Sequence, residues 1–262
     1  MSDTPLLELR GVSKHFGAVI ALHEVDFRVQ PGCVTALVGD NGAGKSTLIK
    51  CVAGIYRIDG GQILFEGNPV NIHGPRDASD LGIEVVYQDL ALADNLDVVE
   101  NMFLGREETD PPLRTLDETN MEARARDTLK SLSVTTIRSV RQTVAGLSGG
   151  QRQSVAVAKA VMWNSKLVIL DEPTAALGVA QTRQVLDLVK RLAEQGLGVI
   201  LISHNLHDIF EVADNITVLR LGQNVAEYKR KETNEQEVVH AITAGKLTKV
   251  PGVVDTTEEV VA

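Results

Sequence analysis

The sequence is short of cysteine, histidine and basic charge, and each shortage narrows what the chain can be. Two cysteines, Cys33 and Cys51, are too few for a disulfide framework or a metal cage, so we expect two buried free thiols. The six histidines show no ligand spacing such as H-x-x-x-H, which argues against a structural metal. A formal charge of -9 argues against a protein whose main task is to hold a nucleic-acid backbone.

Long hydrophobic runs are missing as well. No stretch approaches the roughly 20 apolar residues that a membrane-spanning helix needs, and Met1 to Leu9 contains no basic segment typical of a signal peptide. The sequence therefore predicts a cytoplasmic protein that reaches a membrane only through a partner. Its 262 residues, 44% of them hydrophobic, suffice for a full core.

Apolar runs separated by turn residues predict the strands of a sheet. The run from Val34 to Val38 is typical of a strand buried on both faces of a parallel sheet. It leads through a glycine-rich turn into a predicted helix at Lys45 to Ala53, which Gly54 ends as a cap. The other predicted strands make the sheet wide and mostly parallel, and they fall at Leu7–Leu9, Val25–Val29, Gln62–Phe65, Glu84–Tyr87, Leu167–Leu170, Gly198–Ile202 and Ile216–Leu219.

Strand signals stop near Asp89 and return only after Ala160. Between them, apolar residues recur at spacings of three and four, which indicates helices. The stretch from Glu107 to Leu116 contains two consecutive prolines and is predicted to be a loop. The sequence thus predicts a helical subdomain at about 89–160, inserted into the sheet.

The core of the predicted domain then comprises residues 1–88 and 161–250. Its last part contains a predicted hairpin turn at Leu221 to Gln223 and a capped amphipathic helix at Thr233 to Ala244. Residues 251–262 contain three acids and no bases, and we expect them to form a mobile acidic tail.

The turn after the buried strand fits G-x-x-x-x-G-K-[ST], a phosphate-binding loop. Its glycines let successive N–H groups point at phosphates, and the following helix N-terminus adds partial positive charge. Lys45 would neutralise the β/γ oxygens of ATP, and Ser46 would offer its hydroxyl to Mg²⁺. The alternative, a glycine-rich turn with a solvated lysine, is disfavoured by the flanking strand and helix. The sequence therefore predicts Mg-ATP binding by Gly39, Asp40, Asn41, Gly42, Ala43, Gly44, Lys45, Ser46 and Thr47.

Two carboxylates end the predicted strand at Leu167 to Leu170. Asp171 would lie beside Mg²⁺ and orient its waters, whereas Glu172 would polarise the attacking water as general base. The ordinary alternative is a solvated acidic pair at a strand end. This alternative is disfavoured because the same chain also contains a phosphate loop. Together the two features predict ATP hydrolysis.

Three further polar features lie in predicted turns. Gln88 and His204 each follow a strand, and an open α/β sheet binds its ligand at the carboxyl ends of its strands. Either residue alone is more often an ordinary loop residue. The third feature, Leu147-Ser148-Gly149-Gly150-Gln151, precedes a helical pattern and is either a turn with an N-cap or a second anion site.

In their order along the chain, these motifs resemble those of the nucleotide-binding subunits of ATP-binding-cassette (ABC) transporters, over roughly Leu6 to Ala244. Gln88 matches the family's Q-loop, which also reaches Mg²⁺, and His204 its catalytic switch histidine. Ser148, Gly149, Gly150 and Gln151 match the signature, and Phe16 stands where the family stacks an aromatic ring on adenine.

The resemblance implies an α/β fold. Its parts would be a P-loop NTPase core with a mostly parallel sheet, an N-terminal antiparallel β part and the inserted helical subdomain. It also implies that two copies of the chain sandwich two ATP molecules, each signature facing the other copy's phosphate loop. Membrane-spanning permease subunits would contact the chain near Gln88 to Asn101, which places it peripherally on the inner face of the cell membrane.

Within that family, the phosphate loop, signature and adjoining loops are most similar to ATPases of bacterial carbohydrate importers of the ribose, xylose and fructose type. The resemblance implies import of a monosaccharide, with a sugar-binding protein as an indirect partner and no nucleic acid.

The sequence departs from the pattern of the family in two places. Many relatives fuse two cassettes, whereas this chain has one, and Gly178 stands where the wider family usually has an aspartate that reaches across the dimer.

Two rival functions remain open at this point. A soluble cassette protein acting on ribosomes or DNA would usually carry fused cassettes, coiled-coil insertions or basic arms, and none is visible. A P-loop kinase for small molecules would explain neither Leu147 to Gln151 nor His204.

Overall fold

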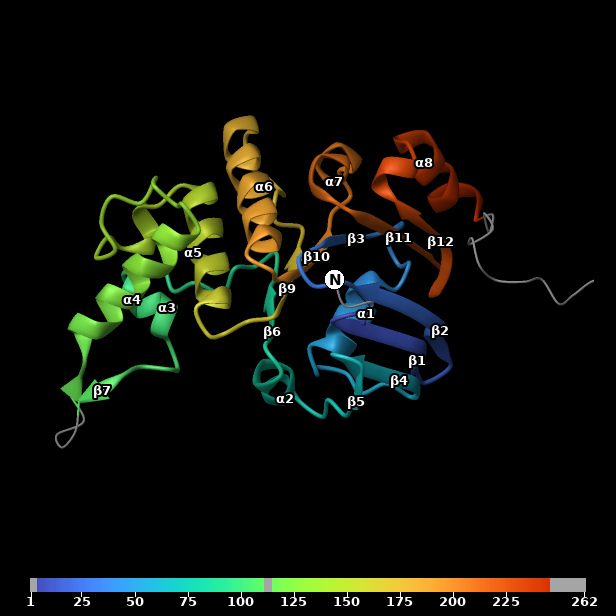
Figure 1. The fold of residues 1–262 in the computed structure, drawn as a ribbon, viewed down its shortest axis with the longest axis horizontal. Coiled ribbons are helices and arrows are strands. Elements are labelled where there is room, and N and C mark those ends of the chain that lie inside the picture. Colours follow the sequence, from blue (N-terminus) through green and yellow to red (C-terminus); the bar gives the residue numbers. More distant parts are fainter. Residues whose placement is uncertain (1–3, 111–114, 246–262) are drawn as a thin grey trace, which may run out of the picture.

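Buried strands alternate with amphipathic helices along most of the chain, as the apolar runs predict. The computed structural model describes residues 4–110 and 115–245, so the predicted acidic tail lies outside the described residues (Figure 1). The strands are β1 (Leu7–Phe16), β2 (Val19–Val29), β3 (Val34–Val38), β4 (Gly60–Phe65), β5 (Asn68–Val70), β6 (Ile83–Val86), β7 (Thr109–Asp110), β8 (Thr115–Leu116), β9 (Leu167–Asp171), β10 (Gly198–Ile202), β11 (Asn215–Arg220) and β12 (Gln223–Lys229). The helices are α1 (Lys45–Val52), α2 (Pro75–Asp80), α3 (Val98–Phe103), α4 (Glu118–Ser131), α5 (Gly149–Val161), α6 (Val179–Glu194), α7 (Leu206–Val212) and α8 (Glu235–Ala244), with short 3-10 turns at Val144–Gly146 and Arg230–Glu232.

A six-stranded sheet in the order β12-β11-β3-β10-β9-β6 runs through the centre of the chain. Strands β11, β3, β10, β9 and β6 are parallel, and β12 joins the edge antiparallel to β11. All residues of β3 and β10 are buried, as expected for strands covered on both faces. The prediction of a wide, mostly parallel sheet is confirmed.

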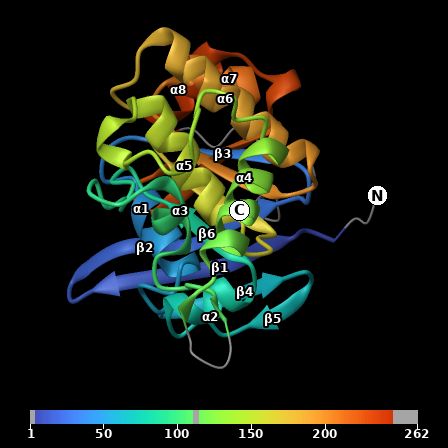
Figure 2. The same cartoon turned by 90° about the vertical axis from the view of Figure 1, so that its left-hand side faces the viewer.

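A second sheet, ordered β2-β1-β4-β5, is antiparallel throughout and confirms the expected N-terminal β part. Helices α6, α7 and α8 cover one side of the parallel sheet, and α1 with the antiparallel sheet covers the other (Figure 2). Residues of β9 alternate between the two faces of the sheet. Val168 and Leu170 belong to the core on the side of α6, α7 and α8, whereas Leu167 and Ile169 belong to the core on the side of α1. The parallel sheet is therefore the shared wall of two cores.

Helices α3, α4 and α5 lie together at one end of the molecule (Figure 1). The helical spacing predicted between Asp89 and Ala160 is confirmed in α4, since Met121, Ala125 and Leu129 are all buried in the core that also includes residues of α5 and α6. The predicted loop from Glu107 to Leu116 is wrong in part, because β7 and β8 pair there as a two-residue ladder. Strands this short give no periodic signal in a sequence. The boundaries of the helical subdomain itself stay a prediction.

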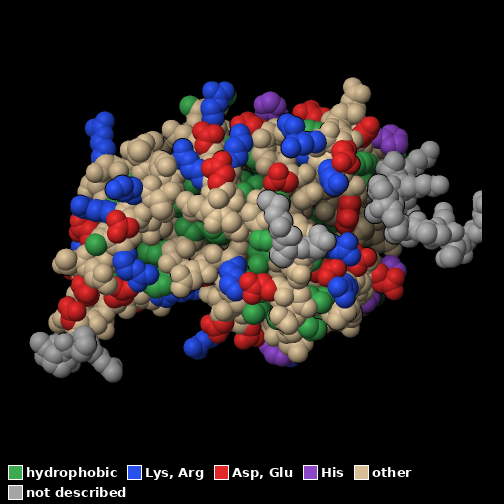
Figure 3. Space-filling model, in the orientation of Figure 1, with side chains coloured by type: hydrophobic (Ala, Val, Ile, Leu, Met, Phe, Trp, Pro, Cys, Tyr) green, Lys and Arg blue, Asp and Glu red, His purple; other side chains and the backbone are tan. Residues whose placement is uncertain are grey.

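The C-terminal hairpin turn is confirmed. Leu221 and Gly222 connect β11 to β12 with φ angles of 49° and 78°, the left-handed values that a tight two-residue hairpin turn requires. In the described ranges, no helix combines the length and hydrophobicity needed to cross a bilayer. Acidic and basic side chains are interspersed over the face drawn in Figure 3.

The two cysteines differ in burial. Cys51 on α1 is buried, and burial raises the pKa of its thiol to about 11. Cys33 is only half-buried, so the expectation of two buried thiols is wrong for this residue. It precedes β3 rather than lying within it, at the end where the strand emerges from the core.

Candidate functional site

A cavity of about 900 Å³ opens at the carboxyl ends of the parallel strands. Five segments that are distant in the sequence meet there, namely the start of β2 and the loops after β3, β6, β9 and β10. This is the edge at which an open α/β sheet binds ligands. The structure therefore brings together the whole phosphate loop, Gln88, Asp171, Glu172 and His204.

The phosphate loop takes a backbone path that only glycine permits at two positions. Gly39 has φ 150°, and a Cβ there would lie 2.1 Å from the carbonyl oxygen of Leu219. Gly44 has φ 103°, and a Cβ there would lie 2.9 Å from the carbonyl oxygen of Ala21. The loop is thus pressed against β2 and the end of β11, which fixes its shape before any phosphate arrives.

Lys45 opens α1 and lies inside the loop. Its Nζ donates to the carbonyl oxygens of Gly39 at 2.6 Å and of Asp40 at 3.0 Å. Burial lowers the pKa of the Lys45 ammonium, and the nearby carboxylates, that of Glu172 first, oppose this effect. The ammonium is therefore held among oxygen atoms, ready to exchange carbonyl partners for phosphate oxygens.

Asp171 and Glu172 end β9 side by side. Burial raises the pKa of Asp171, and repulsion from Glu172 raises it further. A divalent cation at this point would relieve both effects, because it supplies positive charge to an under-neutralised pair of carboxylates. Asp171 shares the cavity with the exposed hydroxyl of Ser46 and the amide of Gln88, so the donor set is all oxygen and fits Mg²⁺.

Glu172 has an unusual backbone. Its φ is 51°, in the left-handed region that side chains other than glycine, asparagine and aspartate seldom adopt, and its N–H donates to Ile202 at 2.9 Å. The turn re-aims the side chain so that Oε2 lies 2.8 Å from Nδ1 of His204. The two atoms are close but not aligned as a hydrogen bond, which leaves the buried Oε2 without one. His204 itself is 79% exposed on the loop after β10.

The signature residues lie elsewhere. Ser148 caps α5 by accepting from the Gln151 N–H, and the Gln151 side chain accepts from the Ser148 N–H at 2.8 Å, so the N-cap interpretation is confirmed. A Cβ on Gly149 would lie 2.9 Å from Cδ2 of Leu177, the end of a flexible side chain that can move aside, so packing within the chain does not require this glycine. Ser148 to Gln151 do not line the cavity of their own chain.

Phe16 also lies outside the lining of the cavity. It pairs in the β1–β2 register with Val19, which does line the cavity together with Ile20 and Ala21. Phe16 is 43% exposed and meets the edge of Tyr56 at 5.0 Å between ring centroids. The sequence reasoning missed Val19 to Ala21, although Val19 and Ile20 are apolar residues next to a turn, an unusual place for exposed β-branched side chains.

Comparisons with known proteins agree on one family. The model of the family described as ABC transporter matches residues 22–175. The fructose import ATP-binding protein FrcA of Rhizobium meliloti is 45% identical, over 94% of this chain and 96% of its own. The xylose/arabinose import ATP-binding protein XylG of Sulfolobus acidocaldarius is 47% identical, over 95% of this chain and 98% of its own. The chain spans 48% of the ribose import ATP-binding protein RbsA of Yersinia pestis, at 40% identity.

Solved structures are similar over almost the whole chain. A nucleotide-free ATP-binding cassette from an ABC transporter superimposes with a TM-score of 0.78 and 27% identity, covering 90% of this chain and 94% of that one. Another cassette of an ABC transporter, in an ADP conformation, superimposes with a TM-score of 0.78 and 28% identity, covering 93% of this chain and 96% of that one.

Proposed function

The chain belongs to the ABC transporter family as an ATPase, and we propose that it energises the import of a monosaccharide through membrane-spanning permease subunits. The observation that carries this proposal is the cavity that gathers Lys45, Glu172 and His204 around one space. Relatives that cover the chain almost end to end are named for importing fructose and xylose or arabinose, which supports a sugar as the cargo.

Binding of ATP would begin at the phosphate loop. Its backbone N–H groups and the N-terminus of α1 would receive the phosphates, and Lys45 would neutralise the oxygens between the β and γ positions. Val19, Ile20 and the neighbouring Phe16 form an apolar edge on which the adenine would lie. The chain thus binds the two ends of the nucleotide with different elements.

Hydrolysis is assigned to Glu172 and His204. Glu172 would accept the proton of the attacking water, and His204, 2.8 Å away, would hold that carboxylate in place. Ser46, Gln88 and Asp171 would hold Mg²⁺, which supplies positive charge to the phosphate oxygens during transfer. Each role rests on the position of the side chain at the carboxyl edge of the sheet.

The active species is proposed to be a dimer. Ser148 to Gln151 do not line their own chain's cavity, so the helix N-terminus of α5 would be available to complete the phosphate site of a second copy. Gly178 contributes no side chain to this interface, so the dimer would be weak without the permease and would form mainly with ATP bound.

The permease subunits would dock near Gln88 to Asn101, on the inner face of the membrane, and a sugar-binding protein would deliver cargo to them. Deleting the chain should abolish uptake of one pentose or hexose while leaving its phosphorylation in cell extracts intact. Sugar uptake is measured with a panel of labelled monosaccharides, and sugar phosphorylation is measured with a kinase assay on cell extracts. Loss of phosphorylation with normal uptake would instead identify a kinase.

A further inference from the structure

One side-chain hydrogen bond joins the turn after β9 to the helix after β10. The hydroxyl of Thr174 donates to the carboxylate of Asp208 at 2.7 Å, and we call this contact the loop–helix bond. Thr174 follows Glu172 by two residues, and Asp208 lies in the first turn of α7, four residues after His204. Among the described residues, no other hydrogen bond connects the turn after Glu172 with α7 or with the loop that precedes α7.

Asp208 is a buried carboxylate that has no cation beside it in the described part of the chain. It is 3% exposed, and on the same helix it is Glu211 that pairs with Lys190, at 3.1 Å. Burying a carboxylate costs free energy unless hydrogen bonds compensate it, so an apolar residue would serve packing better. The acid at this position is therefore explained by its acceptor role toward Thr174.

The ring of His204 has little else to hold it in place. It is 79% exposed, and its charged partner is Glu172, whose Oε2 lies 2.8 Å from Nδ1. The hydroxyl of Ser203 accepts from the Asn205 N–H at 3.0 Å, and the Asn205 side chain accepts from the His207 N–H at 3.1 Å. These bonds fix the loop to α7. The separation of Glu172 and His204 therefore depends on where α7 lies relative to the turn after β9, which the loop–helix bond helps to fix.

We propose that Asp208 is a positioning residue for ATP hydrolysis, which keeps His204 against Glu172 through the loop–helix bond. The inference rests on the roles proposed above for Glu172 and His204. Asp208 does not line the nucleotide cavity, so it acts through these two residues. Its loss should lower the rate of hydrolysis and leave the affinity for ATP unchanged, because the phosphate loop that binds the nucleotide is untouched.

The test removes the loop–helix bond from either side. Thr174→Val keeps the shape of the side chain and loses the hydroxyl, whereas Asp208→Ala loses the acceptor. Each should lower kcat by about 10-fold with the Kd for ATP within about two-fold of wild type, since a displaced catalytic group costs rate and not affinity. The double variant should be no slower than Asp208→Ala, because both changes remove the same bond. Thr174→Ser keeps the hydroxyl and should turn over at the wild-type rate.

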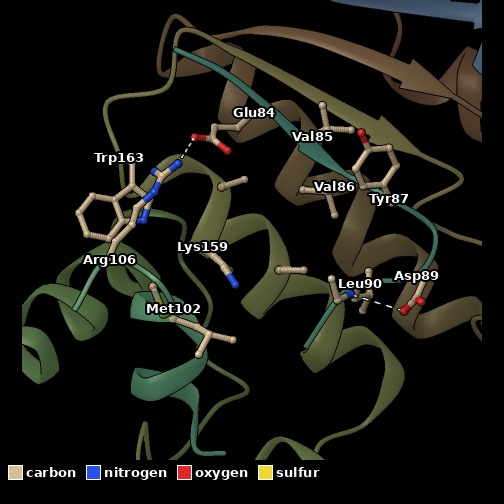
Figure 4. Close-up of a pocket in the computed structure, with 14 residues that line it drawn as sticks. Glu84, Val85, Val86, Tyr87, Asp89, Leu90, Met102, Arg106, Lys159 and Trp163 are labelled. Atoms are coloured by element: carbon tan, nitrogen blue, oxygen red, sulfur yellow. Dashed lines mark hydrogen bonds and ion pairs between the residues drawn. The ribbon is translucent and has the colours of Figure 1, made fainter. Parts of the chain in front are cut away.

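Ser79→Ala is the matched control. The Ser79 hydroxyl donates to the Glu84 carboxylate at 2.7 Å, and Ser79 is half-buried, as Thr174 is. Glu84 also pairs with Arg106, in a pocket between β6, α3 and α5 that shares no lining residue with the nucleotide cavity (Figure 4). Ser79→Ala should therefore keep kcat within about two-fold of wild type. A loss as large as that of Thr174→Val would count against a role specific to the loop–helix bond.

A His204→Ala background separates positioning from folding. His204→Ala should itself lower kcat, and single-turnover measurements with the enzyme in excess resolve its residual rate. Adding Thr174→Val to His204→Ala should slow hydrolysis by less than about two-fold further, because no histidine is left to position. A variant that was only less well folded would lose the same factor in both backgrounds.

Two results would overturn the inference and leave the proposed function intact. One is a wild-type kcat in both Thr174→Val and Asp208→Ala. The other is an equal loss of rate from Thr174→Val with and without His204. Wild-type turnover in His204→Ala alone would instead refute the role proposed for His204, and the inference with it.

Discussion

Lys45 and Glu172 line one cavity, and because we propose separate tasks for them, their loss should leave different defects. Lys45→Ala removes the charge that clamps phosphates and should abolish most ATP binding. Glu172→Gln keeps the shape of the site but removes the base, so it should bind ATP normally and turn over about 10² or more slower. Equilibrium nucleotide titration and steady-state hydrolysis measure the two quantities. An equal loss of affinity in both variants would mean that Glu172 is misassigned.

Glu8 makes a second residue-level prediction, about stability. Its carboxylate is 9% exposed and accepts from Arg10 at 2.7 Å and Arg28 at 2.9 Å, and the Arg10 hydrogen bond is the main cause that lowers its pKa. Glu8→Gln should reduce the free energy of unfolding by about 1–3 kcal/mol at neutral pH. The loss of unfolding free energy in Glu8→Gln relative to wild type should have its whole value above about pH 4.3, the pKa of an unfolded glutamate. It should vanish as the pH falls through the lowered pKa of folded Glu8.

Urea unfolding at a series of pH values checks this prediction. Glu66→Gln is the matched control, because the Glu66 carboxylate is 50% exposed and pairs with the equally exposed Lys166. That variant should change stability by less than about 1 kcal/mol. A Glu8→Gln difference that persists unchanged in acid would show that the carboxylate charge is not what stabilises this sheet.

At the residue scale, the sequence alone located the phosphate loop, both acids and His204, because glycine requirements and strand ends leave a local pattern. It could not predict that Glu172 would lie 2.8 Å from His204, since this distance depends on the pairing of β9 with β10.

At the element scale, the segment between β6 and α3 is held by one buried amide. The Asn101 side chain is fully buried, accepts from the Ala93 N–H at 2.7 Å and donates to the carbonyl oxygens of Ala93 and Asp97 at 3.0 and 2.9 Å. These bonds add to the backbone hydrogen bonds that the loop receives from Val144, at Leu96, and from Ala145, at Asp94. The amide is therefore the side chain that ties this loop to α3.

Asn101→Leu should reduce the free energy of unfolding by about 1–3 kcal/mol, because it leaves the Ala93 N–H without its acceptor and removes the amide's bonds to three carbonyl oxygens. Asn101→Asp keeps the acceptor but turns a buried carboxylate oxygen toward three carbonyl oxygens, so at neutral pH it should be at least as destabilising as Leu. Denaturant unfolding measures the ranking, and amide exchange over residues 89–97 locates the effect. Equal stability of Leu and wild type would show that water replaces the amide.

Strands that are buried on both faces were predictable, whereas the shortest elements were not. The strands β3, β9 and β10 were predicted within a residue because burial on both faces makes them continuously apolar. Helix α2 has six residues and the β7–β8 ladder two per strand, and segments that short complete too few turns or alternations to show a period. Their positions are set by packing between distant parts of the chain.

At the scale of the whole molecule, hydrolysis should require two copies of the chain. Lys45→Ala damages the phosphate-loop half of a composite site, and Ser148→Arg damages the signature half. A mixed dimer would contain one site with both defects and one with neither, so activity should partly return when the two inactive variants are mixed. Steady-state ATP hydrolysis of the mixture measures this.

The control for mixing is each variant alone at the same total concentration. A mixture that stays inactive while mixed dimers are shown to form would exclude the composite site. So would turnover per chain that is independent of dilution down to concentrations where sizing shows only monomer. The sequence predicted this assembly from resemblance, whereas the fold contributes the observation that the α5 N-terminus is unused by its own cavity.

The left-handed backbone at Glu172 has a consequence for how this position would change under selection. A side chain held at φ 51° costs about 1–3 kcal/mol, and glycine or asparagine would be relaxed there. A library screened only for heat resistance should therefore enrich Glu172→Gly and Glu172→Asn, folded proteins that melt later than the parent and no longer turn over ATP. With Glu172 as the proposed base, folding and turnover would demand different amino acids at this one position, so heat resistance gained there would come at the expense of activity.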